Sequence, residues 1–159
     1  MAGFTLSSSQ FQGQVPKAQV YHDFGAGGDN KSPELSWSGA PEGPKSYLLI
    51  CHDADAPGPG GWWHWCAFNI PATTTSLAED ASATGMPAGS VQVKNSYGSV
   101  GYGGACPPPG DQAHLYQMTL YALDTAALEL DENVSPAMVL FVADANVIGK
   151  AGLTAFYAR

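Results

Sequence analysis

The residues of this chain best suited to chemistry lie in three short blocks rich in Asp, His and Gly. In the first block, Asp53 and Asp55 directly follow the apolar run 47–50. Alternate residues of a strand share a face, so Asp53 and Asp55 are expected to point the same way. Two carboxylates on one side cost free energy unless protons, cations or hydrogen-bond donors compensate them. The pattern predicts a pocket floor, and a simple turn before Pro57 remains the alternative.

The second block supplies a histidine in an aromatic setting. His64 lies in the run 62–65, between Trp63 and Trp65. Strand alternation places both tryptophans on one face and the imidazole on the other. A histidine among tryptophans is often a packed core residue, so a core role and a pocket role both stay open for His64.

The third block is the Gly- and Pro-rich segment 101–110, shortly before His114 and Tyr116. Glycines let a backbone approach a ligand closely, and successive N–H groups in such a loop can hold an anion. Prolines have no N–H, so the donors would come from the residues from Gly103 to Cys106, which include Gly104. An imidazole and a phenol on one strand face are further donors for an anion oxygen. A glycine-rich loop alone is a weak signal, and this one gains weight from its position.

Composition and charge limit the classes of function. Residues 1–159 are expected to form a single domain, because 159 residues with 45% hydrophobic content can bury a sizeable core. A net charge of −8 argues against nucleic acid and against anionic membrane surfaces, both of which attract basic proteins. The longest apolar run, 137–143, is too short to span a bilayer, so no transmembrane segment is expected.

The cysteines and the N-terminus favour a cytoplasmic location. Cys51, Cys66 and Cys106 form no Cys-x-x-Cys motif, and any disulfide would leave one thiol unpaired. Three reduced thiols are the simplest interpretation. Cys51 and Cys66 could still be neighbours across two strands, which would allow a disulfide. The first residues show no basic stretch followed by an apolar one, so no signal peptide is predicted.

Periodicity predicts a mainly β fold with one helix near the C-terminus. The apolar spacing from Met138 to Ile148 is helical, with Ser135 and Pro136 as N-cap and first residue and Gly149 as the C-cap. Residues 73–89 are expected to form a long loop with at most a short helical turn. Alternating or apolar runs predict strands at 3–6, 34–37, 45–53, 64–70, 115–123 and 153–157.

The same blocks resemble the phosphatidylethanolamine-binding proteins, in particular the small bacterial YbhB/YbcL-type branch, also called Raf-kinase-inhibitor-like. The resemblance implies an antiparallel two-sheet Greek-key sandwich with a C-terminal helix. It implies that His64 and His114 contact the phosphate of a ligand, and that a cis peptide bond precedes Pro57. The family's usual Asp-Pro-Asp is 53–55 here, with Ala at the centre. The resemblance is carried by segments 32–37, 53–57, 62–65, 101–114 and 150–157.

The resemblance implies a small-anion binding module for phosphate or a phospholipid headgroup, which regulates a kinase or a protease. The predicted ligand-binding residues are Asp53, Asp55, Pro57, His64, Gly104, Cys106, His114 and Tyr116. No catalytic residue, metal ligand or cofactor is assigned. A hydrolase or a metal-dependent enzyme that uses the His/Asp pocket is the alternative, and an interaction protein with a vestigial pocket is the third hypothesis. By analogy with the bacterial branch, a homodimer is expected.

Overall fold

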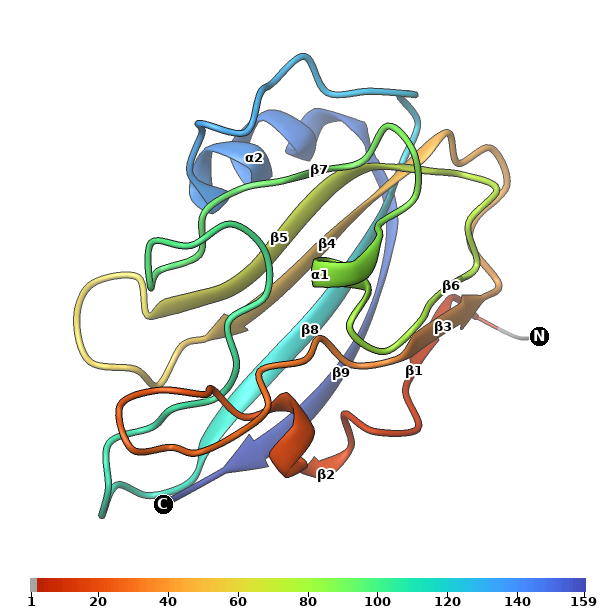
Figure 1. The fold of residues 1–159 in the computed structure, drawn as a ribbon. Helices are drawn as coiled ribbons and strands as arrows, with labels where there is room; N and C mark the ends of the chain where they lie inside the picture. The colour runs from red at the N-terminus through yellow and green to blue at the C-terminus, as the bar shows by residue number, and fades with distance from the viewer. Residues whose placement is uncertain (1–2) are drawn as a thin grey trace.

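Two β-sheets form the body of the computed structural model, which describes residues 3–159 (Figure 1). The smaller sheet has the order β1-β3-β6, and the larger has the order β2-β9-β8-β4-β5-β7. The strands are β1 (Thr5–Ser7), β2 (Gly13–Gln14), β3 (Leu35–Ser38), β4 (Ser46–Asp53), β5 (Trp62–Pro71), β6 (Ser76–Leu77), β7 (Val91–Gln92), β8 (His114–Leu123) and β9 (Val147–Tyr157). The prediction of a mainly β, two-sheet fold is confirmed.

The larger sheet is mainly antiparallel, as expected, and contains one parallel pair. β2 pairs in parallel with β9, with Gly13 opposite Ala155. The other strand pairs in both sheets are antiparallel. Because β2 is only two residues long and contains glycine, its sequence carries no strand signal.

The larger sheet is covered on both faces, which explains why β4 is apolar along nearly its whole length. One face packs against the smaller sheet around Leu49, Trp65 and Met118. The opposite face packs around Leu48 and Phe68 under the C-terminal helix. A strand buried on both faces reads as a continuous hydrophobic run rather than an alternating one.

The C-terminal helix α2 (Pro136–Ala143) begins where the sequence predicts and ends earlier. Ser135 Oγ accepts a hydrogen bond from the Met138 N–H at 3.1 Å, so the predicted N-cap is confirmed. The chain then makes a 3₁₀ turn, η2 (Asp144–Asn146), and enters β9. Gly149 lies inside this strand, where a Cβ would meet Pro41 Cγ at 2.5 Å, so the C-cap prediction was wrong.

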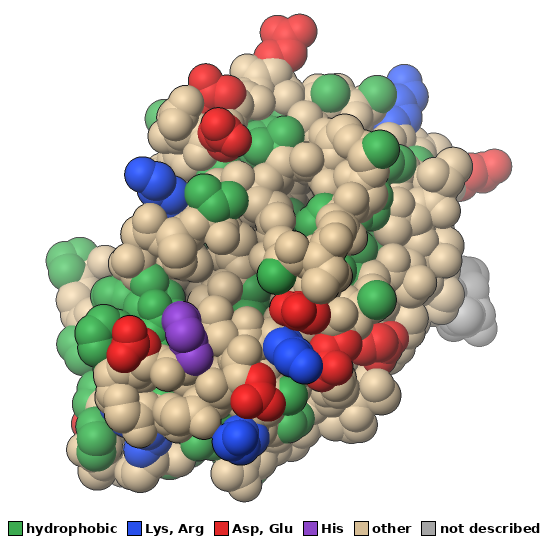
Figure 2. Space-filling view, viewed as in Figure 1, with side chains coloured by type: hydrophobic (Ala, Val, Ile, Leu, Met, Phe, Trp, Pro, Cys, Tyr) green, Lys and Arg blue, Asp and Glu red, His purple; other side chains and the backbone are tan. Residues whose placement is uncertain are grey.

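Short elements occupy the segments between the long strands. A 3₁₀ turn, η1 (Lys17–Gln19), follows β2, and the helical turn α1 (Ala81–Thr84) lies in the predicted long loop. Figure 2 shows acidic side chains spread over one face with Lys and Arg side chains between them. Among residues 3–159, no helix is long and apolar enough to cross a membrane.

Candidate functional site

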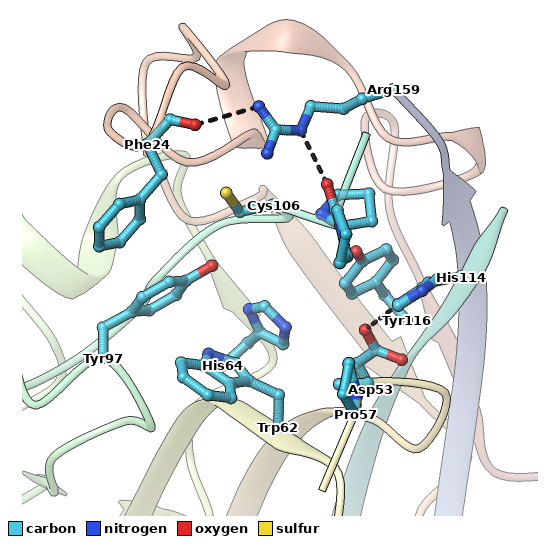
Figure 3. Close-up of a pocket in the computed structure, with 13 residues that line it drawn as sticks. Phe24, Asp53, Pro57, Trp62, His64, Tyr97, Cys106, His114, Tyr116 and Arg159 are labelled. Atoms are coloured by element: carbon cyan, nitrogen blue, oxygen red, sulfur yellow. Dashed lines mark hydrogen bonds and ion pairs between the residues drawn. The ribbon is translucent and has the colours of Figure 1, made fainter. Parts of the chain in front are cut away.

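A cavity of about 390 Å³ opens at one end of the larger sheet, where β4 ends and β5 and β8 begin (Figure 3). These three strand ends come together because β4 pairs with both β5 and β8. Most of the surface that lines the cavity is apolar. The lining residues are Phe24, Asp53, Ala56, Pro57, Trp62, His64, Tyr97, Cys106, Pro107, Pro108, His114, Tyr116 and Arg159.

Asp53 is the last residue of β4 and is almost fully buried, with 2% of its surface exposed. Its Oδ2 accepts a hydrogen bond from His114 Nδ1 at 2.7 Å, and its Oδ1 accepts one from the Asp55 N–H at 2.8 Å. One oxygen of Asp53 therefore makes the expected turn, and the other anchors a histidine of the cavity lining. A buried carboxylate needs such partners to stay ionised.

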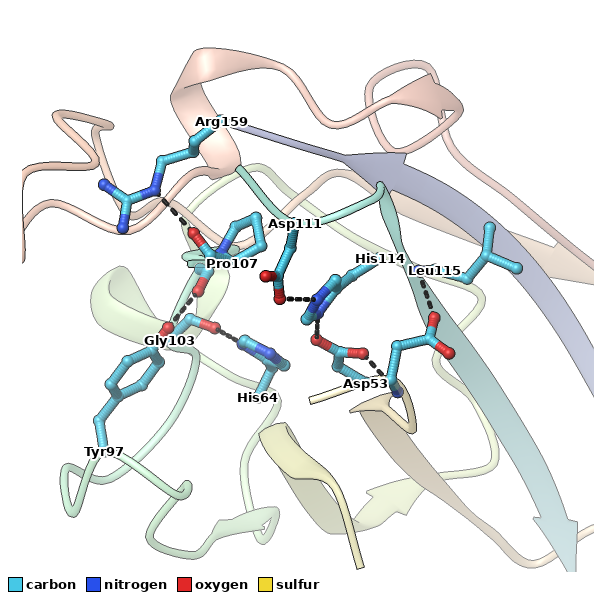
Figure 4. Close-up of polar contacts among 11 residues, drawn as sticks. Asp53, His64, Tyr97, Gly103, Pro107, Asp111, His114, Leu115 and Arg159 are labelled. Carbon is cyan, nitrogen blue, oxygen red and sulfur yellow. Dashed lines mark hydrogen bonds and ion pairs between the residues drawn. The ribbon is translucent and has the colours of Figure 1, made fainter. Parts of the chain in front are cut away.

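Asp55 lies outside the cavity lining. The strand ends at Asp53, so the alternation that would place both carboxylates on one face does not extend to Asp55. The Asp55 side chain is exposed, and its Oδ2 accepts a hydrogen bond from the Leu115 N–H at 3.0 Å (Figure 4). Asp55 thus connects the loop after β4 to the start of β8.

His64 reaches the cavity through a β-bulge. Cys51 pairs with Trp65 and His52 pairs with Trp63, so His64 is the extra residue between two pairs. Trp65 consequently lies on the same face as His64, in the core between the sheets, while Trp63 packs on the opposite face. The prediction that both tryptophans oppose His64 was wrong for Trp65, because strand alternation fails at a bulge.

The buried imidazole of His64 has one nitrogen committed to the protein. Its Nδ1 donates to the Gly103 carbonyl at 2.7 Å (Figure 4). The other ring nitrogen, Nε2, takes no part in this hydrogen bond. Burial lowers the pKa of His64 to about 4, although the Gly103 carbonyl and the Asp53 charge act in the opposite direction. At neutral pH His64 is therefore uncharged, and Nε2 carries a lone pair.

His114 begins β8 and is held between two carboxylates. Nδ1 contacts Asp53 and Nε2 contacts Asp111 Oδ2 at 3.1 Å. Burial alone would lower the pKa of His114, but the hydrogen bonds and charges of Asp53 and Asp111 outweigh it and raise the pKa above its usual value. The structure thus favours an imidazolium whose two N–H groups are already engaged.

Two buried polar atoms at the cavity have no hydrogen-bond partner among residues 3–159. These atoms are the hydroxyl of Tyr116 and the indole Nε1 of Trp62. Burial, and then the charge of Asp53, raises the pKa of Tyr116, so the phenol keeps its proton. An indole N–H can only donate, and buried donors in native proteins almost always have an acceptor.

The glycine-rich segment forms a wall of the cavity, but two of its N–H groups are already used. Gly103 N–H donates to the His64 carbonyl at 2.8 Å, and Gly104 N–H donates to Asn30 Oδ1 at 2.7 Å. The prediction that these glycines cradle an anion is therefore wrong while those bonds hold. Gly104 is needed for packing, since a Cβ there would meet the Gln19 carbonyl oxygen at 2.3 Å.

The lining also includes Cys106 and Pro57, as the sequence suggested. Burial raises the pKa of Cys106, which Arg159 lowers only in part, so the thiol stays protonated near neutral pH. Within residues 3–159 all peptide bonds are trans, so the cis bond expected before Pro57 is absent.

Three free thiols are confirmed. Cys51 and Cys66 are both buried, and Cys106 is partly buried. Cys51 lies in the core between the sheets, whereas Cys66 lies on the opposite face of the larger sheet. These two side chains point apart, so a disulfide between the adjacent strands is excluded in this fold.

Four large side chains in the lining were not among the predicted ligand-binding residues: Arg159, Tyr97, Phe24 and Trp62. Arg159 holds two walls together, because Nε donates to the Pro107 carbonyl at 2.8 Å and Nη1 donates to the Phe24 carbonyl at 3.1 Å. The Tyr97 hydroxyl donates to the Gly104 carbonyl at 2.8 Å. Only Trp62 had a usable signal, since it flanks the aromatic run that contains His64.

Metal binding has no support in this arrangement. Within the described part of the chain, no group of three or more His, Cys, Asp or Glu side chains is placed to hold a metal ion. The Asp53–His114–Asp111 series is instead a chain of hydrogen bonds in which the imidazole lies between the carboxylates.

A two-sheet fold with a His- and Tyr-lined cavity at the strand ends defines a family of binding proteins. The family model described as phosphatidylethanolamine-binding protein matches residues 7–158, and the chain belongs to this family.

Relatives from two bacteria agree with this assignment. The chain is 44% identical to the UPF0098 protein YbcL of Escherichia coli, over 98% of this chain and 88% of that protein. It is 39% identical to the UPF0098 protein YbhB of the same bacterium, over 91% of this chain and 92% of that protein. The crystal structure of E. coli YbcL, which is described as a new member of the mammalian PEBP family, matches this structure with a TM-score of 0.96 over 99% of both chains. The homologue CT736 of Chlamydia trachomatis matches with a TM-score of 0.83 at 30% identity, over 100% of this chain and 99% of that chain.

Proposed function

We propose that the cavity binds a small anion of the phosphate type and that the protein is a binding module rather than an enzyme. The observation that carries this proposal is the pair of buried donors without partners, Tyr116 Oη and Trp62 Nε1. Both line the same cavity. An anion oxygen there would accept from both groups and remove the cost of leaving them unpaired.

The charges around the cavity support an anion that is taken up together with a proton. His114, when protonated, contacts Asp53 and Asp111, and Arg159 supplies a second positive charge in the cavity lining, so two cations stand beside two carboxylates. His64 is neutral at pH 7, because burial lowers its pKa to about 4. Its Nε2 can donate to the anion only after protonation, and the incoming negative charge favours that protonation.

The hydrolase hypothesis has weaker support. A nucleophile must be activated by a base or by a lowered pKa. Burial raises the pKa of Cys106, and both nitrogens of His114 are engaged by carboxylates. The remaining His64 has a free Nε2, but no hydroxyl or thiol is hydrogen-bonded to it within residues 3–159.

The family resemblance extends the proposal. On that basis, the anion-bound protein acts as a cytoplasmic homodimer that regulates a kinase or a protease. Binding of the anion is the part of this proposal that rests on the cavity, and it can be tested alone.

Calorimetric titration with inorganic phosphate at pH 6 tests the proposed function. A hydrogen bond to a charged group is worth about 1.5–3 kcal/mol, so Tyr116→Phe and Trp62→Phe should each weaken binding about 10- to 100-fold. Tyr121→Phe and Trp63→Phe are matched controls, because both side chains pack on the opposite face of the same sheet. Equal losses in the variants and in the controls, or no binding by the native protein, would contradict the proposal.

A further inference from the structure

Phe24 combines an unusual backbone with an unusual exposure. Its φ is +55°, in the left-handed region that bulky side chains rarely adopt. The other non-glycine residues with positive φ in the described chain are Asn30, Asn69 and Asp80, whose types tolerate this conformation. The Phe24 side chain is nevertheless 69% exposed. An apolar ring is thus held in an unfavourable conformation without the compensation of burial, a combination found where strain serves function.

The structure fixes this ring at the cavity. The Phe24 carbonyl accepts from Arg159 Nη1 at 3.1 Å, and the side chain lines the cavity mouth (Figure 3). The ring lies within 20° of parallel to two tyrosine rings, with centroids 5.8 Å from Tyr21 and 6.4 Å from Tyr97. Tyr21 and Tyr97 stack on each other at 3.8 Å and 4°. Phe24 is therefore the exposed outer member of an aromatic cluster.

We propose that the anion bound in this cavity carries a planar aromatic ring, which stacks on Phe24. This inference rests on the proposed function, because Trp62 and Tyr116 would hold the anionic end. The cavity of about 390 Å³ is larger than a bare phosphate requires and falls in the range of small-molecule sites. A flat ring next to Phe24 would extend the near-parallel arrangement of aromatic rings and cover the exposed apolar surface. The ligand class is a small aryl phosphate or a similar arene-bearing anion.

Three probes separate stacking from simple apolar burial: inorganic phosphate, cyclohexyl phosphate and phenyl phosphate, titrated by calorimetry at pH 6. The two esters each carry one phosphate group on a six-carbon ring, and only one of the two rings is planar and aromatic. Both esters are also titrated at pH 5, where each is mainly a monoanion because the second pKa of a phosphate group is about 6. We expect phenyl phosphate to bind about 2- to 12-fold more tightly than cyclohexyl phosphate, which is the fold-change that an aromatic pair contributes beyond buried area. Equal affinity of the two esters overturns the inference and leaves anion binding intact. Failure of inorganic phosphate to bind overturns the proposed function.

Substitutions of Phe24 provide the second test. Phe24→Leu keeps an apolar side chain without a ring, so it should abolish the preference for phenyl phosphate over cyclohexyl phosphate. Phe24→Gly removes the ring at a backbone conformation that glycine adopts freely, so its melting temperature should be no lower than that of the native protein. A full phenyl preference in Phe24→Leu, or a markedly lower melting temperature in Phe24→Gly, would overturn the assignment of Phe24 as a ligand platform.

Discussion

His64 should make anion binding depend on pH, and Figure 4 shows the geometry responsible. Nδ1 must carry a proton to donate to the Gly103 carbonyl, so a neutral ring presents only a lone pair at Nε2. An anion gains nothing from that lone pair and is repelled by it. Protonation turns Nε2 into a donor and adds a positive charge, so anion binding and proton uptake should favour each other.

The size of the effect follows from the pKa of about 4 for His64 in the ligand-free protein. A site that requires the imidazolium gains about tenfold in affinity for each unit by which pH falls below the pKa of the complex, and the gain ends once the pH reaches the pKa of the free protein. Between pH 7 and pH 5 the gain is at most about 100-fold, or about 2.7 kcal/mol. The charged or titratable groups that face the ring are Asp53, Tyr97 and Tyr116. Both phenols stay protonated across this range, because burial raises the pKa of each.

Sulfate is the suitable probe, because a phosphate group has a second pKa of about 6 and would titrate within the same range. Calorimetry in two buffers of different ionisation enthalpy measures the protons taken up with each sulfate. We expect uptake close to one proton for the native protein at pH 6. His64→Gln should bind sulfate with an affinity that changes little from pH 7 to pH 5. The exposed His22 provides the matched control, since His22→Gln should behave as the native protein does.

If sulfate affinity were constant from pH 7 to pH 5 with no proton uptake, His64 would not face the anion. If His64→Gln retained the full pH dependence, another group would supply the proton. Sharing of one proton between Asp53 and Asp55 is not a suitable alternative, because Asp53 is buried against His114 while Asp55 is exposed and bound to the Leu115 N–H.

Three further predictions follow from the same structure. Without ligand, the free energy of unfolding should fall by about 3 kcal/mol as pH drops from 6.5 to about 4. The reason is that the pKa of His64 is lower in the folded protein, so the unfolded chain binds more protons at this residue in that pH range. Urea titrations at several pH values measure this change. Asp53→Ala should cost about 3–5 kcal/mol of stability in the same assay at pH 7, because it leaves the buried Nδ1 of His114 without an acceptor. A loss under about 1 kcal/mol would contradict the pairing. Light scattering should show a homodimer that Phe156→Glu disrupts, because the Phe156 side chain is 44% exposed beside Leu115 on the neighbouring strand. A native protein that stays monomeric at all concentrations would contradict this prediction.

The sequence predicts best those features that depend on local physics. The N-cap at Ser135 needs only a hydroxyl three residues before a free N–H, and the structure shows that bond. β9 was recognised only at its end, because Gly149 inside it reads as a helix terminus. Its pairing with β8 at ten positions overrides that local signal. Strand alternation likewise placed His64 on the correct face but Trp65 on the wrong one, since nothing in the residue types announces a bulge.

The residues of the candidate site also differ in how far the sequence predicts them. His64, His114 and Tyr116 could be predicted because their residue types suit anion binding and they stand at strand ends. Arg159 could not, because its partners Phe24 and Pro107 are 135 and 52 residues away in the chain. Contacts across such separations are set by the packing of loops around the sheet, which carries no periodic signal in the sequence.

The bulge in β5 also has a consequence for engineering. The bulge separates β5 into two portions. The residues from Trp65 onward pack in the core, and the residues before Trp65 include those that line the cavity. Side chains at Trp62 and His64 can therefore be varied in a library without shifting the pairing of the residues beyond the bulge. Deletion of one residue within 62–64 would remove the extra position, and either His64 or Trp65 would then turn to the opposite face. Redesign of ligand specificity in this scaffold should proceed by substitution at constant length.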